Sequence, residues 1–503
     1  MEISGGRISL ARLNAVAFGN EQVELTDSAR DRIRKSRAIV EKILEQGQVI
    51  YGISTGFGKL SDVKIEPDEL HKLQLNLVRS HACGIGKPLA IPEVRAMIFL
   101  RANVLVLGFS GVRLEIVEFL CQILNRGVYP VIPEKGSVGA SGDLAPLAHL
   151  ALALIGEGES FFENERLASL DALSRAGMNP IALEAKDGLA LLNGTQAMHS
   201  VGGLALFRAK RLARVADLAG AMTLEALMGT PRAFDSRIHK ARPHPGQITV
   251  AEHMRSLVRQ SEIRESHRED DPRVQDAYSI RCIPQVHGAV RDALAYAENV
   301  LEIESAGATD NPLVFPEKGD VISGGNFHGA PLALALDFAA IAVTDLMSIS
   351  ERRIERMVNP DMSYGLPAFL ARKPGLQSGM MIAHVAAASL LNEAKVLAHP
   401  ASIDNVPTSA GKEDHVSMGM TSALKLRSIV ENAEHLLAIE LLAGAEALEH
   451  RRPLKAGAGV ERAHATIREY AAPLLEDRVL APDISAIAAA IRKGEFDSEG
   501  EIL

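Results

Sequence analysis

A glycine- and serine-rich loop that leads directly into an apolar helix is the part of this sequence best suited to chemistry. Residues 136–146 read Gly-Ser-Val-Gly-Ala-Ser-Gly-Asp-Leu-Ala-Pro. Glycine adopts positive φ angles at little cost, and Gly142 presents a backbone N–H that no side chain hinders. Asp143 is a favourable N-cap, and Pro146 suits the first turn of a helix over residues 144–155. The helix N-terminus favours negative charge at the loop, so the pattern fits a reactive centre, an anion-binding loop or a plain turn.

Residues 138–150 (VGASGDLAPLAHL) favour the reactive centre, because they closely resemble the signature of the aromatic amino-acid ammonia-lyases and aminomutases. The resemblance implies that Ala140, Ser141 and Gly142 close into a 4-methylideneimidazole-5-one (MIO) ring. In that reaction the Gly142 nitrogen attacks the Ala140 carbonyl carbon, and Ser141 then loses its hydroxyl. The resemblance thus implies a strong electrophile made from the chain itself, with no external cofactor.

Two tyrosines fall at catalytic positions of the same family. Tyr51 opens a second glycine-rich loop, residues 51–60, and matches the catalytic base. The glycine spacing of this loop does not fit a phosphate-binding P-loop. Tyr278 matches the tyrosine that holds or protonates groups at the ring. A tyrosine acts as a base only when its pKa is lowered from about 10, so we expect the site to lower the pKa of Tyr51.

A polar block near the middle of the chain is suited to binding the α-carboxylate of an amino acid. Gln275, Tyr278 and Arg281 lie within seven residues of one another and can converge on one cleft, although exposed polar residues also cluster by accident. The fork of an arginine guanidinium matches a carboxylate well. The resemblance assigns substrate contacts to Gln275 and Arg281, and adds Asn193 as a residue near both the ring and the carboxylate.

The choice of substrate depends on a few positions that differ between branches of the family. The Ser80-His81 pair resembles the histidine-specific branch, which makes His81 a contact to the substrate side chain. Glu413 matches the acidic residue that faces the imidazole in that branch. The residue before Glu413 is usually glutamine in the family, whereas this chain has Lys412. A cation at that position could lower the pKa of Glu413. Two further residues are implied by resemblance: Met381 packs on the side chain, and Phe327 lies beside the ring.

The resemblance therefore implies elimination of ammonia from L-histidine to give trans-urocanate. Two alternatives stay open at this point. One is another branch of the family, a tyrosine or phenylalanine ammonia-lyase or an aromatic 2,3-aminomutase, which shares the ring. The other is a non-catalytic scaffold protein without the ring. The intact Ala140-Ser141-Gly142 triplet, together with Tyr51, argues against the scaffold.

Composition excludes several other classes of protein. The chain has 503 residues, 47% of them hydrophobic and 23% charged, which is typical of a globular protein. A net charge of −9 argues against a nucleic-acid-binding surface. No apolar leader follows Met1, and the apolar run at 97–109 is too short to cross a bilayer. Three scattered cysteines indicate a reducing compartment, so we expect a cytoplasmic protein without membrane partners.

Helical periodicity dominates the sequence and predicts an all-α fold. Helical patterns cover residues 26–45, 69–128 with a break at 80–84, 196–227, 287–305, 331–357, 378–397 and 416–449. The helix over 331–357 would be about 40 Å long, which is typical of a long-helix bundle. We expect an N-terminal domain over residues 1–195 that carries the MIO loop, and a bundle with a C-terminal helical region over 196–503.

The segment 231–271 is rich in charge and histidine, and we interpret it as a solvated connection. Its histidines do not have metal-ligand spacing, and the neighbours Glu413, Asp414 and His415 lack further ligands, so no metal is expected. The family resemblance implies a homotetramer whose active sites combine residues from several subunits. The expected partner is thus a small amino-acid substrate, bound between copies of the chain.

Overall fold

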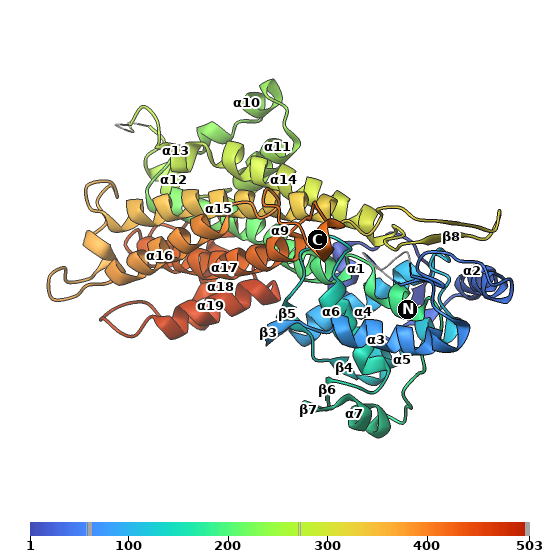
Figure 1. The fold of residues 1–503 in the computed structure, drawn as a ribbon. Coiled ribbons are helices and arrows are strands. Elements are labelled where there is room, and N and C mark those ends of the chain that lie inside the picture. Colours follow the sequence, from blue (N-terminus) through green and yellow to red (C-terminus); the bar gives the residue numbers. More distant parts are fainter. Residues whose placement is uncertain (57, 59–62, 270, 272, 498–503) are drawn as a thin grey trace. The chain divides into compact units, whose positions relative to one another are not determined.

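The computed structural model describes residues 1–56, 58, 63–269, 271 and 273–497. Part of the glycine-rich loop considered above, at positions 57, 59 and 60, lies outside the described residues. The predicted all-α class is confirmed: helices make up most of the described chain, and its strands are short (Figure 1). The chain forms two compact units.

Unit 1 comprises residues 1–204, 297–337 and 400–424. The helices that lie wholly within it are α1 (Leu10–Phe18), α2 (Asp27–Glu45), α3 (Leu70–His81), α4 (Ile91–Leu105), α5 (Leu114–Arg126), α6 (Leu144–Leu154), α7 (Ser169–Arg175) and α8 (Asp187–Leu192). Helix α4 is buried on almost every side, as the central helix of a core must be. Short 3-10 turns cover Pro67–Glu69 and Ser409–Gly411.

The strands of unit 1 pair in small sheets that fasten its loops. They are β1 (Glu2–Ile3), β2 (Glu24–Leu25), β3 (Ile85–Pro88), β4 (Tyr129–Pro130), β5 (Pro133–Lys135), β6 (Glu159–Phe162), β7 (Glu165–Ala168), β8 (Leu313–Phe315) and β9 (Asp320–Ile322). The pairings are β1 with β2 in parallel, and β3–β5, β4–β6–β7 and β8–β9 antiparallel. The hairpin β8–β9 leads to a third glycine-rich loop, residues 322–329.

Unit 2 comprises residues 205–296, 338–399 and 425–503. Its own helices are α10 (Ser236–Ala241), α11 (Pro245–Leu257), α12 (Glu262–Ser266), α13 (Tyr278–Arg281), α16 (Met381–Leu397), α18 (Ala458–Tyr470) and α19 (Ala481–Lys493). Short 3-10 turns cover Pro231–Phe234 and Ala368–Leu370. The long helices α9 (Gln196–Ala226), α14 (Ile283–Ser305), α15 (Ala330–Val358) and α17 (Gly419–Glu449) have residues in both units.

Most helical ranges predicted from periodicity are confirmed to within a few residues, including the end of α3 at His81. The range 69–128 is divided more than predicted, because residues 82–90 and 106–113 are not helical. The compact units differ from a simple division at residue 195, because residues 297–337 and 400–424 belong with the N-terminal unit. The chain returns to this unit twice, and each return adds a loop. The division into residues 1–195 and 196–503 stays a prediction about folding domains.

The interpretation of residues 231–271 as a solvated connection was wrong. This segment holds α10, α11 and α12, and His239 and His267 in it are buried. His239 lies 3.0 Å from the Gln247 amide and 3.1 Å from the Ala233 carbonyl oxygen. A buried imidazole such as that of His239, whose two nitrogens both have polar partners, gives the same sequence pattern as a solvated one, which is why composition alone misled.

A buried polar network connects the long helices within unit 2. Arg353 of α15 forms an ion pair with Glu440 of α17 at 2.5 Å, and both side chains are fully buried. Thr223 of α9 donates a hydrogen bond to Glu440 at 3.1 Å. His287 of α14 contacts Asp217 of α9 at 2.7 Å. These contacts place the four helices side by side, as Figure 1 also shows.

Replacing Glu440 with glutamine is expected to lower the free energy of unfolding by about 3–5 kcal/mol, because it leaves the buried Arg353 charge unpaired. Chemical denaturation monitored by circular dichroism checks this value. Asp31→Asn serves as the control, since it removes a pair with Arg34 whose side chains are 66% and 61% exposed. Such a surface pair contributes less than about 1 kcal/mol. Equal denaturation midpoints for the two variants would contradict the prediction.

Among the described residues, α15 is the helix long and apolar enough to cross a membrane, and 67% of its apolar window is buried within the chain. That degree of burial is typical of a core helix. The cysteines Cys83, Cys121 and Cys282 are all unpaired. Burial raises the pKa of the Cys121 thiol to about 12, so this thiol stays protonated.

Candidate active site

The glycine- and serine-rich loop is packed tightly within unit 1. The Asp143 N–H donates a hydrogen bond to the Gly194 carbonyl at 2.7 Å, and the Ser417 hydroxyl donates one to the Gly139 carbonyl at 2.9 Å. Gly142 has φ +74°, and a Cβ there would collide with Gly194. Gly139 has φ +67°, and its Cβ would collide with Ser417. Only glycine fits at these two positions, so the sequence around Ser141 is required by its geometry.

Asp143 does not cap α6 with its side chain, although it occupies the N-cap position. One carboxylate oxygen instead accepts a hydrogen bond from the Met198 N–H at 2.8 Å, in the first turn of α9. The other accepts from the Ser137 hydroxyl at 2.7 Å. Asp143 therefore caps α9 and ties the loop to it. Complete burial raises the pKa of Asp143 to about 6.

Two cavities of unit 1, of about 700 and 610 Å³, meet at this loop and share Tyr51, Ser141 and Glu413 in their walls. The first cavity is also lined by Ala140, Asn311, Ser323, Gly324, Phe327, His328, Lys412, Asp414 and His415. The second is also lined by Ser80, His81, Asn193 and a set of apolar residues that includes Leu77, Leu144, Leu189 and Leu192. The wall of the second cavity is mostly apolar with a few polar groups, which is typical of a small-molecule site.

The side chain of Tyr51 is half-buried at the wall that both cavities share. Burial is the main cause that raises the pKa of its hydroxyl, and the carboxylates of Asp310 and Glu413 raise it further. A hydrogen bond with the backbone of Gly58 acts in the opposite direction. The surroundings of Tyr51 in this chain therefore raise its pKa and do not produce the expected lowering.

His81 is the last residue of α3, and its imidazole is held in one orientation. Its Nδ1 lies 2.8 Å from the Leu77 carbonyl oxygen, which can only accept a hydrogen bond. Nδ1 therefore carries the proton of the neutral ring, and Nε2 is left as an acceptor. This arrangement suits a ligand that presents an N–H group to the apolar cavity.

Glu413 is fixed by three hydroxyl groups. Its Oε1 accepts a hydrogen bond from Ser141 at 2.6 Å, and its Oε2 accepts from Thr408 at 2.6 Å and from Ser409 at 2.9 Å. Burial raises the pKa of Glu413, but these hydrogen bonds lower it below its usual value overall. Lys412 is exposed and is not among these causes, so the carboxylate stays ionised without it.

Asn193 and Phe327 complete the group in unit 1. The Asn193 amide is 4% exposed and donates a hydrogen bond to the Asn311 carbonyl at 3.1 Å, which leaves its second N–H for the cavity. Phe327 lines the first cavity together with Ala140 and Ser141. Unit 1 thus brings together seven residues around the buried Gly142: Tyr51, His81, Ala140, Ser141, Asn193, Phe327 and Glu413.

The remaining predicted residues lie in unit 2. Arg281 donates a hydrogen bond to Gln275, and its guanidinium carbon lies 4.5 Å from the centroid of the Tyr278 ring. Tyr278 is 70% exposed, so the three side chains form a polar group at the surface of their unit. Met381 begins α16 and is partly exposed. The convergence of Gln275, Tyr278 and Arg281 agrees with their spacing in the sequence.

Sequence reasoning missed several residues at the cavities, above all Asn311, His328 and His415. The two imidazole rings stack with a centroid distance of 5.8 Å, and His328 Nε2 lies 3.2 Å from the His415 carbonyl oxygen. These residues lie in loops between elements of secondary structure, and no local sequence pattern distinguishes them. Among the described residues, no group of three histidine, cysteine or acidic side chains is placed to hold a metal ion.

The geometry of the loop fits an internal ring. Ala140 and Gly142 are buried, whereas Ser141 is partly exposed to the cavity. Gly142 has a positive φ, and the side of it where a side chain would lie is filled by Gly194. A cyclisation between the Gly142 nitrogen and the Ala140 carbonyl needs a bent backbone, which a glycine at positive φ allows.

Comparisons with known proteins agree across the chain. A family model described as "Aromatic amino acid lyase" matches residues 8–469. The histidine ammonia-lyase of Anaeromyxobacter sp. (strain K) is 55% identical, over 98% of this chain and 99% of the relative. The crystal structure of histidine ammonia-lyase from Trypanosoma cruzi has a TM-score of 0.91 at 44% identity, with 98% and 94% covered. That of a tyrosine aminomutase from Streptomyces globisporus has a TM-score of 0.94 at 39% identity, with 99% and 97% covered.

Proposed function

The chain belongs to the aromatic amino acid lyase family, and we propose that it is an enzyme that eliminates ammonia from L-histidine to give trans-urocanate. The observation that carries the choice of substrate is the pair His81 and Glu413 at the wall of the 610 Å³ cavity. His81 presents a hydrogen-bond acceptor and Glu413 an ionised carboxylate. The imidazolium form of a histidine side chain can donate one N–H group to each of them, whereas a phenyl ring can donate to neither.

We further propose that Ala140, Ser141 and Gly142 form the MIO ring. The required glycine and the partly exposed serine support this proposal. The ring supplies an electrophile that makes the amino group of the substrate a better leaving group. Ser141 loses its hydroxyl in the process, which frees Glu413 Oε1 from its contact with that hydroxyl. Negative charge at the loop faces the N-terminus of α6.

The chain's own residues orient the substrate and move its proton. Asn193 offers an N–H to the carboxylate, while His81 and Glu413 hold the imidazole. Tyr51 takes the proton from the β-carbon as the amino group departs. The apolar walls, which include Leu77 and Leu192, exclude water from the reacting atoms.

We propose that a homotetramer completes the site, with Gln275, Tyr278 and Arg281 supplied by another copy of the chain. A guanidinium beside the substrate would pair with its carboxylate and would lower the pKa of Tyr51. The support is the exposure of Tyr278 and of apolar side chains on α16, such as Ile382 at 66% and Val396 at 70%. The proposed location is the cytoplasm, in keeping with the unpaired cysteines.

Product formation from three amino acids tests the proposal. The purified enzyme is incubated separately with L-histidine, L-tyrosine and L-phenylalanine, and the near-ultraviolet absorbance is followed. We expect urocanate from L-histidine and little product from the others. Coumarate or cinnamate in its place would refute the roles of His81 and Glu413, and a β-amino acid product would identify an aminomutase. Size-exclusion chromatography with light scattering tests the tetramer.

A further inference from the structure

A fully buried ion pair lies next to the cavities and has no part in the reaction described above. Lys186 Nζ lies 3.0 Å from Asp310 Oδ2, and both side chains are 0% exposed. The two residues are 124 positions apart in the sequence. Burying two charges is costly and contributes little to stability compared with apolar packing. The presence of such a buried pair suggests that it has a function other than stabilising the fold.

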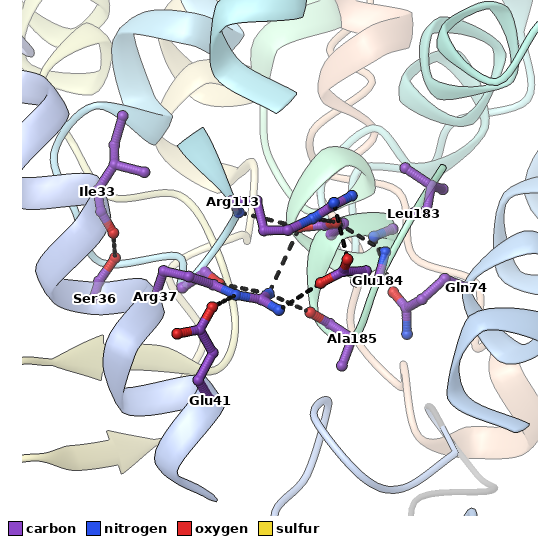
Figure 2. Close-up of polar contacts among 12 residues, drawn as sticks. Ile33, Ser36, Arg37, Glu41, Gln74, Arg113, Leu183, Glu184 and Ala185 are labelled. Carbon is purple, nitrogen blue, oxygen red and sulfur yellow. Dashed lines mark hydrogen bonds and ion pairs between the residues drawn. The ribbon is translucent and has the colours of Figure 1, made fainter. Parts of the chain in front are cut away.

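The backbone at Lys186 is also held in an unfavourable conformation. Its φ is +74°, in the left-handed region that lysine rarely adopts. Figure 2 shows how the preceding residues are fixed by two arginines: Arg37 donates to the Ala185 carbonyl at 2.8 Å, and both Arg37 and Arg113 pair with Glu184 at 3.1 Å. Arg113 also pairs with the buried Asp187 at 2.7 Å. The surrounding structure thus forces the Lys186 side chain inward.

Asp310 transmits this constraint to the cavity. Its Oδ1 accepts a hydrogen bond from the Asn311 N–H at 2.6 Å, while its Oδ2 faces Lys186. The Asn311 carbonyl then accepts the hydrogen bond from the Asn193 amide at 3.1 Å. A continuous chain of contacts therefore runs from Lys186 to the side chain that we expect to bind the substrate carboxylate.

Residues 311 and 312, which follow Asp310, support two other parts of the candidate site. The Asn311 side chain accepts hydrogen bonds from the Gly324 N–H at 2.8 Å and the Ser323 hydroxyl at 3.1 Å, in the loop that carries Phe327. The ring of Pro312 fills the space beside Gly52, the neighbour of Tyr51, so that a Cβ at Gly52 would lie 2.7 Å from it. A shift of Asp310 would therefore move several walls of the cavity together.

We infer that Lys186 and Asp310 are positioning residues: their ion pair fixes the Asn311 carbonyl and thereby aims the Asn193 amide at the substrate carboxylate. The inference rests on the proposed deamination reaction and adds two residues to it. It predicts that kcat depends more on the hydrogen bonds of the pair than on its charges. A neutral pair that keeps the same bonds should therefore work.

Asp310 also acts on Tyr51 through its charge, which gives a readout that a purely structural role would not move. The Asp310 carboxylate raises the pKa of Tyr51, as does Glu413. The other titratable side chains that line the two cavities are His81, His328, Lys412, Asp414 and His415. Removing the negative charge at 310 lowers the pKa of Tyr51, so the acid limb of the rate profile moves to lower pH.

The test compares Asp310→Asn, Lys186→Gln and the double replacement with the wild-type enzyme, using whichever of the three amino acids the wild type deaminates. A wrong substrate assignment therefore leaves this comparison intact. We expect Asp310→Asn to lower kcat about tenfold or more, since small misplacements of binding groups have effects of that size. The double replacement restores an amide-to-amide bond and should recover most of kcat. The acid limb should lie at lower pH in both variants that lack the carboxylate.

Intact mass and circular dichroism establish that each variant has matured and folded. Glu159→Gln is the matched control, because it removes an exposed ion pair of unit 1 with Arg166 and should change nothing. Unchanged kcat and an unchanged pH profile in folded Asp310→Asn would overturn the inference. So would a double replacement that folds but is as slow as the single variants, because the bonds would then be restored without effect.

Discussion

Replacing Ser141 with alanine is expected to abolish ammonia release from L-histidine, with kcat falling by about 10³-fold or more. Alanine has no hydroxyl to lose, so the electrophilic methylene of the ring cannot form, and loss of a covalent catalytic group has effects of this size in other enzymes. The wild-type chain should have an intact mass two water molecules below that encoded, whereas Ser141→Ala should show no such deficit. Mass spectrometry and urocanate absorbance measure the two effects independently.

Ser28→Ala is the control for this experiment, since Ser28 is an exposed serine of α2 in the same unit. It should keep both the mass deficit and the activity. An active Ser141→Ala enzyme would rule out the ring. A wild-type chain with its full encoded mass would instead favour a protein that keeps the fold without the chemistry.

Replacing Tyr51 with phenylalanine is expected to lower kcat by about 10²- to 10⁴-fold, which is the usual contribution of a general base. The tyrosinate form of Tyr51 becomes more abundant as the pH rises. Since burial, Asp310 and Glu413 raise the pKa of Tyr51, this increase occurs at alkaline pH. The wild-type rate should therefore rise with pH on the alkaline side of neutrality. The residual rate of Tyr51→Phe should lack this rise. Initial rates of urocanate formation across pH give both results.

Tyr470→Phe provides the comparison, because the hydroxyl of Tyr470 bonds Glu495 in unit 2, outside the group of predicted site residues. It should keep both kcat and the pH dependence. A Tyr51→Phe enzyme with near wild-type turnover would remove Tyr51 from the role of base. The proton would then have to go to another group at the cavity, such as Glu413, whose carboxylate is ionised and lies on the same wall.

Much of the site in unit 1 could be predicted from sequence because its residues lie in recognisable local motifs. The loop around Ser141 and the Ser80-His81 pair are contiguous, and each ends or begins a helix where periodicity changes. The contact between Ser141 and Glu413 joins residues 272 positions apart, and only the family resemblance suggested that they share a site. Helix positions were predictable for a similar reason, since an apolar stripe repeats within each helix.

Three features were beyond the reach of the sequence. The carboxylate of Asp143 caps α9 instead of α6, because the fold brings two helix starts together at Gly142 and Gly194. In the sequence, Lys186 and Asp310 look like ordinary surface charges, and the contact between them joins residues 124 positions apart. The direction of the Tyr51 pKa shift depends on burial and on Asp310, which no local pattern reports.

The buried network of unit 2 has a consequence for how the long helices align along their axes. Glu440 is held at once by Arg353 and Ser350 of α15 and by Thr223 of α9. Sliding α17 by one turn, about 5.4 Å, would break all of these bonds together and leave two charges buried without partners. Apolar stripes alone would tolerate such a slip, because leucine and alanine pack nearly as well one turn away. The polar residues therefore fix the axial positions of α9, α15 and α17 relative to one another.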